Sequence, residues 1–460
     1  MPALRMGATV KKKEEVMLKG NLRWFALLLA VALVALAALA CAPTAAPTPT
    51  ATKPPAPAPT AAPAATPTVA PAKTAEPTKP PAPSPTSPPK AMEPITVGFL
   101  GSFSGYVAPM GVPQRDTAVM LEEKINKEGG INGRPLKIVI YDDESDESKG
   151  VLVAKKLIEQ DKVLGLVGTS TAGIAMAAAA IVEEAKVPWV THAASRSVIL
   201  PDKKWIFKMP FSERLFVPHM YAFMKEKGAT KLALLSQGAG FGREGRKYVE
   251  DTAEKAGFTL VAKEEYGPTD TDMSAQLTKI KAAAPDFMII YGAEPAGAIS
   301  AGQARGLGFT IPLIGPGSLT TPFIMGNEQL RRGLEGMYVS TGKPDVWDQL
   351  QDNDRQKGVL KTLLEMMRAK YGPTRAVSTW EAVGYDGLSI MLNAIKRANP
   401  DPAKLEEARS KIRDSLETGT KDYVGANTFV TYSPTEHEGE PHLENAVIVQ
   451  IREGKMALVK

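Results

Sequence analysis

The chain has 460 residues, 44% of them hydrophobic and 23% charged, which is enough for two or three domains with a large buried core. The 55 lysines and arginines only slightly outnumber the 50 aspartates and glutamates, so the charge balance gives no support for a nucleic-acid partner. A single cysteine excludes an internal disulfide bond and any metal or iron–sulfur site made of several cysteines.

The first 40 residues have the pattern of a signal peptide. An unbroken apolar run over residues 24–40 follows several basic residues and ends in small residues before Cys41. A start at Met17 instead of Met1 would give a signal of ordinary length. The alternative is a membrane-spanning anchor, although the run is at the lower limit for crossing about 30 Å of hydrocarbon. Both interpretations place the rest of the chain outside the cytoplasm.

The segment before and including Cys41, LAALAC, resembles a bacterial lipobox, in which a small residue precedes a cysteine that is lipidated on its sulfur. The resemblance implies that a lipid at Cys41 anchors the protein to the cell membrane. Residues 41–93 consist largely of proline, alanine and threonine and cannot form an apolar core. Proline at this density favours an extended chain, so we expect a semi-rigid tether between the anchor and the folded part.

From Pro94 onward, short apolar segments alternate with helical ones. In the first half we expect strands at 95–100, 136–141, 163–168 and 188–191, with helices over 114–128, 148–160 and 172–185. The same rhythm restarts after Pro210, with strands at 231–236, 258–262, 286–291 and 311–315 and helices near 242–256, 273–284 and 296–305. Helices over 354–370 and 378–398 and a terminal hairpin from residue 445 complete the chain.

This alternation predicts an α/β protein with two doubly wound lobes, each built on a parallel sheet with right-handed crossovers. In such sheets ligands bind beyond the carboxyl ends of the strands. The candidate site is therefore the cleft where the strand ends of the two lobes face each other. Asp142 and Asp143 follow the second strand and precede a helix whose first turn carries Glu147. We interpret the two aspartates as capping and loop residues rather than as a catalytic carboxylate pair.

Five segments of the folded part are specific as an ordered set. They are ITVGFLGSFSGYVAPMG from residue 95, NKEGGINGRPLKIVIYDDESDESKG from 126, VPWVTHAAS from 187, GPTDTDMSAQLTKIKAAAPDFMIIYG from 267 and WEAVGYDGLSI from 380. Together they resemble the substrate-binding proteins of branched-chain amino acid ABC transporters, the type I periplasmic binding class. The resemblance covers nearly all of residues 94–460. It implies a monomer without cofactor, metal or catalytic residue that captures a small molecule and delivers it to permease subunits.

The resemblance also implies a three-crossover hinge, with crossings near Phe211, Ser340 and Glu438. These crossings divide the folded part into one lobe of residues 94–211 and 341–437 and a second lobe of residues 212–340 and 438–460. Ligand contacts to both lobes would favour the closed form, which the permease can distinguish.

In the first lobe, the resemblance assigns ligand contacts to three loops that follow strands. The residues are Ser104 and Met110 in the first loop, Ser170, Thr171 and Ala172 after the third strand, and Ala193 and Ser195 after the fourth. The last two loops precede helices, whose unpaired amide groups and positive ends suit a carboxylate. The neighbouring His192 could add a further donor.

The second lobe departs from the amino acid binders. Phe241 matches their aromatic residue but has no phenol, and Ala293 stands in place of a tyrosine, next to Glu294. Gly317 replaces the glutamate that pairs with the ammonium of the ligand, although a buried ammonium needs a carboxylate or equivalent acceptors. Either Glu294 supplies that carboxylate and the ligand is an amino acid or amine, or the ligand is a carboxylate, amide or aromatic acid without an ammonium. The glycine at position 317 favours the second alternative.

Two other classes of function compete with transport. A ligand-sensing module for a receptor or signalling partner uses the same fold, but no membrane-spanning helix or signalling domain follows the clamp before Lys460. The glycines of residues 238–242 approach a dinucleotide-binding pattern, yet the sequence has no nucleophile elbow, no Walker phosphate loop and no His-Glu-x-x-His motif. We therefore expect a binding protein and not an enzyme.

Overall fold

The computed structural model describes residues 92–201, 203–209, 211–293, 295–439 and 442–459. The predicted signal peptide (1–40), the lipidation site Cys41 and all but the end of the predicted tether (41–93) lie outside these residues, and so does Glu294. Within the described ranges, none of the helices combines the length and the apolar character that a membrane crossing requires.

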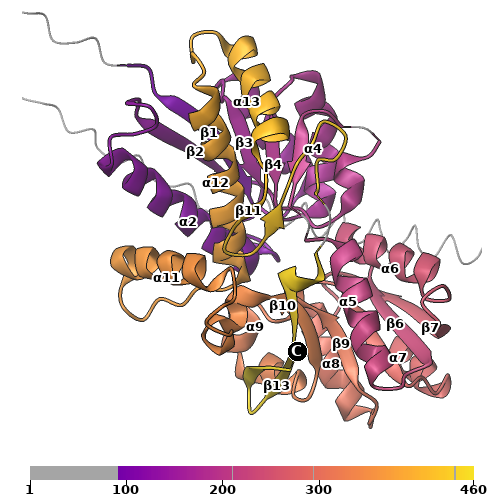
Figure 1. Ribbon diagram of the computed structural model, residues 1–460. Coiled ribbons are helices and arrows are strands. Elements are labelled where there is room, and N and C mark those ends of the chain that lie inside the picture. The colour runs from indigo at the N-terminus through magenta and orange to yellow at the C-terminus, as the bar shows by residue number, and fades with distance from the viewer. Residues whose placement is uncertain (1–91, 202, 210, 294, 440–441, 460) are drawn as a thin grey trace, which may run out of the picture. The chain divides into compact units, whose positions relative to one another are not determined.

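The first sheet has five parallel strands in the order β2-β1-β3-β4-β5 (Figure 1). They are β1 (Ile95–Gly101), β2 (Leu136–Asp142), β3 (Gly165–Gly168), β4 (Trp189–Thr191) and β5 (Ile206–Lys208). The helices α2 (Ala108–Lys127), α3 (Glu147–Glu159) and α4 (Ala172–Glu184) connect the first four. Successive side chains of β1 point to opposite faces of the sheet. Val97 and Phe99 pack with α2 on one face, and Leu100 packs with α3 and α4 on the other. This two-sided burial explains the continuous apolar runs of the strands.

The second sheet has seven strands in the order β14-β13-β10-β9-β8-β6-β7. Its parallel strands are β6 (Lys231–Gln237), β7 (Thr259–Tyr266), β8 (Phe287–Tyr291), β9 (Leu313–Pro316) and β10 (Tyr338–Gly342), and β13 (Ala446–Arg452) and β14 (Lys455–Leu458) form an antiparallel hairpin. One face carries α5 (Glu213–Glu226) and α6 (Gly240–Thr252), and the other carries α7 (Ser274–Ala282), α8 (Ala296–Gly306), α9 (Pro322–Gly326) and α10 (Glu328–Gly333). The predicted doubly wound α/β fold and its terminal hairpin are confirmed.

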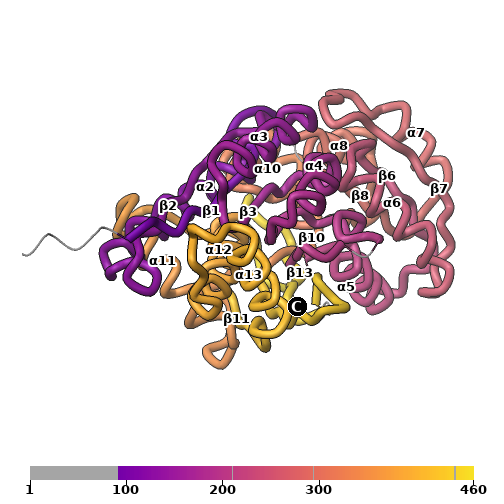
Figure 2. The backbone as a smooth tube through the Cα atoms, turned by 90° about the horizontal axis from the view of Figure 1, so that it is seen from above, coloured from indigo at the N-terminus to yellow at the C-terminus, as the bar shows by residue number. Residues whose placement is uncertain are grey.

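Three helices late in the chain return to the first sheet, and Figure 2 shows the last two of them side by side. They are α11 (Lys357–Tyr371), α12 (Thr379–Ala398) and α13 (Leu405–Gly419). The helix α12 lies beside α2 and buries Val383 and Met391 in the core that contains Val97. Its first turn has a capping box, in which the side chains of Ser378 and Glu381 each accept a hydrogen bond from the backbone of this turn. A short antiparallel pair, β11 (Tyr423–Val424) and β12 (Phe429–Val430), follows α13.

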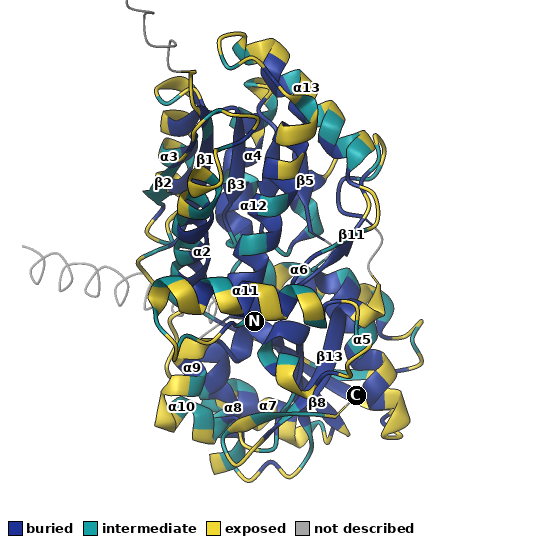
Figure 3. Cartoon of the chain, turned by 60° about the vertical axis from the view of Figure 1, so that its left-hand side comes forward, coloured by how far each residue is buried: buried dark blue, intermediate teal, exposed yellow. Residues whose placement is uncertain are grey.

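The sequence prediction omits β5, α5, β10 and α13, each for a local reason. The strand β5 is three residues long and ends in the buried Lys208, and α5 contains Pro218 in its interior. In β10 the sequence YVSTG is mostly polar or small although the strand is buried. The outward face of α13 is exposed (Figure 3), and its inward face buries few large apolar side chains, mainly Ile412 and Leu416. Tertiary packing therefore overrides a weak local pattern in all four elements.

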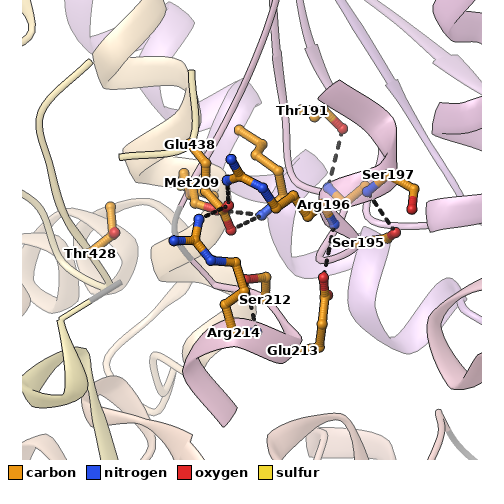
Figure 4. A network of polar contacts seen from close by, with 12 residues as sticks. Thr191, Ser195, Arg196, Ser197, Met209, Ser212, Glu213, Arg214, Thr428 and Glu438 are labelled. Atoms are coloured by element: carbon orange, nitrogen blue, oxygen red, sulfur yellow. Dashed lines mark hydrogen bonds and ion pairs between the residues drawn. The ribbon is translucent and has the colours of Figure 1, made fainter. Parts of the chain in front are cut away.

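Three segments join the two sheets. The chain passes from β5 to α5, returns from β10 through the η4 turn (Lys343–Gln349), and leaves the first sheet again after His437 to reach β13. At the third crossing, the fully buried carboxylate of Glu438 accepts hydrogen bonds from Lys208 Nζ at 3.0 Å and from Arg214 Nη1 at 3.0 Å. The guanidinium of Arg196 binds the same carboxylate (Figure 4). This ion cluster ties the first and third crossings together.

Candidate ligand-binding cavity

A cavity with a volume of about 90 Å³ lies at the carboxyl ends of strands from both sheets. The loops after β3 and β4 form one wall, through residues 170–173 and His192. The loops after β6, β8 and β9 form another wall, through Gln237, Ala293 and Ser318. Each sheet therefore contributes the loops that follow its own strands.

Aromatic side chains make up much of the remaining wall. Tyr106 precedes α2, Phe211 and Phe216 belong to the first crossing and α5, Phe241 lies in the first turn of α6, and Trp380 lies in the first turn of α12. No lysine or arginine is among the described residues that line the cavity. In the described part of the chain, no group of histidine, cysteine, aspartate or glutamate side chains is arranged to hold a metal ion. The wall is thus largely apolar with a few polar groups, as small-molecule sites are.

The helices α4 and α6 both begin at the cavity, one from each sheet. Their N-cap residues, Thr171 and Ala239, provide no side-chain cap. The amide groups of each first turn therefore have no acceptor within the helix, and two positive helix ends meet at the cavity. The two ends touch, because a Cβ atom added to Gly240 would lie 3.0 Å from the backbone nitrogen of Gly173.

A second contact lies between the η2 turn (Arg196–Ile199) and α6. Ser197 Oγ donates a hydrogen bond to Glu244 Oε2 over 2.8 Å. A wider cleft of about 840 Å³ adjoins the cavity, with Pro268 and Phe323 among its lining residues. Tyr106 lines both spaces, so it lies at the boundary between the cavity and the wider cleft.

A chain of hydrogen bonds orients Ser170 at the cavity wall. Gln114 Nε2 donates to Ser170 Oγ over 2.6 Å, and Gln114 Oε1 lies 2.7 Å from His192 Nδ1. The imidazole therefore donates from Nδ1, and the Ser170 hydroxyl keeps its own proton for another acceptor. Burial lowers the pKa of His192 to about 3, so the ring is neutral at physiological pH. Its Nε2 atom faces Gly387 of α12.

Asp143 holds the loops behind these hydroxyl groups. Its carboxylate accepts hydrogen bonds from Ser102 Oγ at 2.5 Å and from Thr169 Oγ1 at 3.0 Å. Ser102 Oγ also lies 3.3 Å from Oγ1 of Thr171, which is one of the residues that line the cavity. Burial raises the pKa of Asp143, and these donors oppose the shift. Asp142 accepts hydrogen bonds from backbone amides of the adjoining loops. The predicted loop role of both aspartates is confirmed.

The site residues predicted from the sequence fall into two groups. Lining the cavity are Met110, Ser170, Thr171, Ala172, Phe241 and Ala293. Off its wall are Ser104, Ala193, Ser195 and Gly317. Glu294 belongs to neither group, since it lies outside the described residues.

Three of the residues off the wall belong to the first sheet. Ser104 lies on an exposed loop, where its Oγ donates to Asp142 Oδ2 over 2.7 Å. Ser195 is fully buried and caps the η2 turn by accepting a hydrogen bond from the amide of Ser197. Ala193 is buried behind the wall. The serine hydroxyls at both positions are therefore occupied by local backbone or loop contacts.

Gly317 has no space for a side chain. A Cβ atom at this position would lie 2.4 Å from Thr341 Oγ1. Its neighbours Pro316 and Ser318 line the cavity instead, and Ser318 Oγ donates to the carbonyl oxygen of Gly292 over 2.6 Å. A glutamate at position 317 could not be accommodated without moving β10.

The sequence prediction misses Tyr106, Glu147, Gln237 and Trp380 as lining residues. Tyr106 follows β1 and Gln237 ends β6, so the rule that sites lie beyond strand ends could have found both. Trp380 begins α12, far along the chain, and no local pattern directs it to the cavity. Glu147 begins α3, where an acidic residue is an ordinary feature of a helix start.

The profile of the periplasmic binding protein family matches residues 94–455. The chain is 29% identical over 355 residues to the leucine-, isoleucine-, valine-, threonine-, and alanine-binding protein of Pseudomonas aeruginosa, which covers 76% of this chain and 90% of that protein. An extracellular ligand-binding receptor from Rhodopseudomonas palustris superposes with a TM-score of 0.73 at 25% identity, over 80% of this chain and 100% of that one. A leucine-binding protein from Thermotoga maritima shares the fold, with a TM-score of 0.68 at 22% identity over 80% of this chain and 98% of that one. Because the family match spans most of the chain, this protein belongs to the periplasmic binding protein family.

Proposed function

We propose that this protein is an extracytoplasmic solute-binding protein that captures a small amino acid, organic acid or amide and delivers it to an ABC importer. The observation that carries the proposal is the enclosed cavity in which the uncapped ends of α4 and α6 meet beside Ser170 and Thr171. Amide groups at a positive helix end bind a carboxylate without a basic side chain. The Pseudomonas relative is named for its binding of amino acids, which carry such a carboxylate.

Isothermal titration calorimetry on the full-length protein tests this proposal. The panel consists of the common amino acids and of simple organic acids and amides. We expect saturable binding of at least one of them with one molecule per chain, and release of the compound unchanged. Conversion of a bound compound into product, or no binding anywhere in the panel, would contradict the proposal.

We propose that binding closes two lobes around the three crossings. The lobes are residues 94–211 with 341–437 and residues 212–340 with 438–460. Contacts of one ligand with loops of both sheets favour the closed arrangement, which a permease can distinguish from the open one. Small-angle scattering is expected to show a smaller radius of gyration with a bound ligand, and an unchanged radius would count against closure.

The membrane attachment is a separate proposal. A lipid on Cys41 and the tether of residues 41–93 would hold the binding lobes near their permease. Mass spectrometry of the protein from its native membrane tests this. An N-terminal peptide that begins with an acylated Cys41 supports the anchor, and an unmodified Cys41 in the mature protein contradicts it.

Ser170→Ala is expected to weaken ligand binding about 10-fold, because the hydroxyl that Gln114 orients can no longer donate to a ligand carboxylate. Ser170→Thr retains the hydroxyl and is expected to bind within about threefold of the wild type. Calorimetry with the tightest compound of the panel measures both. The exposed Ser148→Ala is the matched control. Unchanged affinity in Ser170→Ala would show that this hydroxyl does not contact the ligand.

A further inference from the structure

We infer that Glu147 is a specificity-determining residue, whose carboxylate pairs with a cationic nitrogen of the ligand and selects zwitterions over acids without a cation. The inference rests on the proposed solute-binding function and names the chemical class of its ligand. Among the described residues that line the cavity, Glu147 is the only side chain charged at neutral pH, because His192 is neutral there. From the described lining residues, a ligand in the cavity therefore meets one side-chain charge, and that charge is negative.

Glu147 does not cap its own helix. Asp146 already caps α3 by accepting a hydrogen bond from the amide of Lys149 over 2.8 Å. The ammonium group of Lys149 pairs with Glu144 and not with Glu147. Within the described part of the chain, the Glu147 carboxylate makes no hydrogen bond and no ion pair. Its charge is therefore left for a partner that the protein does not supply there.

The position of Glu147 is next to the amide groups of α4. Its Oε1 atom would lie 2.2 Å from a Cβ atom added to Gly173, so the glycine leaves the room that the carboxylate occupies. The negative charge also acts on the aromatic wall, since burial raises the pKa of the Tyr106 hydroxyl and Glu147 and Asp143 raise it further. Glu147 thus lies beside the first turn of α4 and close enough to Tyr106 to raise the pKa of its hydroxyl.

The cavity wall consequently has two parts of opposite sign. The amide groups at the starts of α4 and α6 are positive, and Glu147 beside them is negative. A zwitterion satisfies both parts, and the aromatic rings around the cavity add favourable contacts to a cationic nitrogen. An acid without a cation would satisfy the amide groups, but its carboxylate would lie near the like charge of Glu147, which would remain without a cationic partner.

This assignment reverses the expectation drawn from Gly317. The glutamate of the amino acid binders is absent from the second lobe, and the position has no space for one. In this chain the counter-charge comes from the first lobe, at the start of α3. The missing residue therefore does not exclude a ligand with an ammonium group.

Calorimetry with matched pairs of compounds tests the inference on the full-length protein. Each amino acid is compared with the acid that lacks its ammonium, such as leucine with 4-methylpentanoate and phenylalanine with 3-phenylpropanoate, and glycine betaine with acetate extends the comparison to a quaternary nitrogen. We expect the zwitterion of the tightest-binding pair to bind about 10- to 100-fold more tightly than its partner, the change that accompanies loss of a charge-assisted hydrogen bond or ion contact. In Glu147→Gln this ratio is expected to fall to about threefold or less.

Two further variants make the result specific. Glu159→Gln removes an exposed glutamate from the same helix and is expected to keep the wild-type ratio. Glu294→Gln tests the other glutamate that the sequence places near the cavity, and loss of the ratio in that variant alone would overturn the assignment to Glu147. Glu147 is exposed at the cavity rim, so Glu147→Gln is expected to keep the wild-type melting temperature. Glu147→Asp, which retains the charge, gives a second measure of the ratio.

The remaining outcomes separate this inference from the proposed function. If acids without a cation bind as tightly as zwitterions, or if Glu147→Gln keeps the wild-type ratio, the inference is wrong while the solute-binding function stands. If no compound of either class binds the wild-type protein, the proposed function is wrong and the inference is wrong with it.

Discussion

Replacing Glu438 by glutamine is expected to lower the free energy of unfolding by about 3 to 5 kcal/mol, the cost of breaking a buried ion pair from one side. The side chains of Glu438 and Lys208 are both fully buried and 3.0 Å apart. Glutamine would leave the Lys208 ammonium with one neutral acceptor in addition to the carbonyl oxygen of Met209 at 2.8 Å. Arg196 and Arg214 would lose their shared charge partner at the same time. Urea unfolding of the wild type and the variant measures the difference.

Glu436→Gln is the matched control for this experiment. Glu436 pairs with the same Arg196 at 3.1 Å, but its side chain is 26% exposed. A pair that is partly open to water contributes less than a fully buried one, so this control is expected to cost about 1 kcal/mol or less. If both variants lowered the free energy of unfolding by the same amount, the burial of Glu438 would not be what makes its ion pairs important.

The dependence on pH provides a second check on Glu438. Burial would raise the pKa of this carboxyl, but Lys208 and the hydrogen-bond donors around it hold the pKa at about 2, below its ordinary value of 4.5. A lowered pKa in the folded state stabilises the protein fully above pH 4.5, and this stabilisation is lost as the pH falls toward 2. The difference between wild type and Glu438→Gln is therefore expected to shrink over that interval. A difference that stays constant down to pH 2 would contradict the assignment.

Gly240→Val is expected to weaken ligand binding about 5- to 150-fold, which corresponds to the 1 to 3 kcal/mol of an overpacked contact. A Cβ atom at this position would already lie 3.0 Å from the backbone nitrogen of Gly173 and 3.3 Å from the end of Met176. The two additional methyl groups of valine must push the starts of α4 and α6 apart. The cleft would then be unable to close fully around its ligand, while each sheet keeps its own core.

Calorimetry and small-angle scattering together test this prediction. The tightest compound of the panel is expected to bind weakly to Gly240→Val and to cause less compaction than in the wild type. Gly306→Val is the matched control, because Gly306 is an exposed glycine at the end of α8 with open space around its Cα atom. Wild-type affinity in Gly240→Val would show that the two helix ends need not touch when the ligand is bound.

The fold could be predicted from the sequence because the strands are buried on both faces. Runs such as the one that contains Val97 and Phe99 have a continuous apolar character that few other structures produce. The elements that could not be predicted have little of this signal. The strand β5 ends in Lys208, which is tolerated only because Glu438, more than 200 residues later, lies beside it.

The candidate site could be predicted only in part. Ser170, Thr171 and Phe241 follow strands directly, so topology alone brings them to the cavity. Ser195 has the same position in the sequence pattern, but its hydroxyl caps a turn, and local capping cannot be distinguished from ligand binding without coordinates. Glu147 is the opposite case, because its sequence position predicts an ordinary helix-start residue whereas the structure places it at the cavity.

The four residues of the η2 turn take part both in the ion cluster at the crossings and in the contact with α6. Arg196 binds Glu438 at the third crossing between the sheets, and the adjacent Ser197 binds Glu244 of α6. A substitution in this turn is therefore expected to change both the thermal stability of the protein and its affinity for the solute. An engineer who converts the protein into a fluorescent biosensor should place the dye elsewhere, because a label at this turn would report its own disturbance of the third crossing along with the solute.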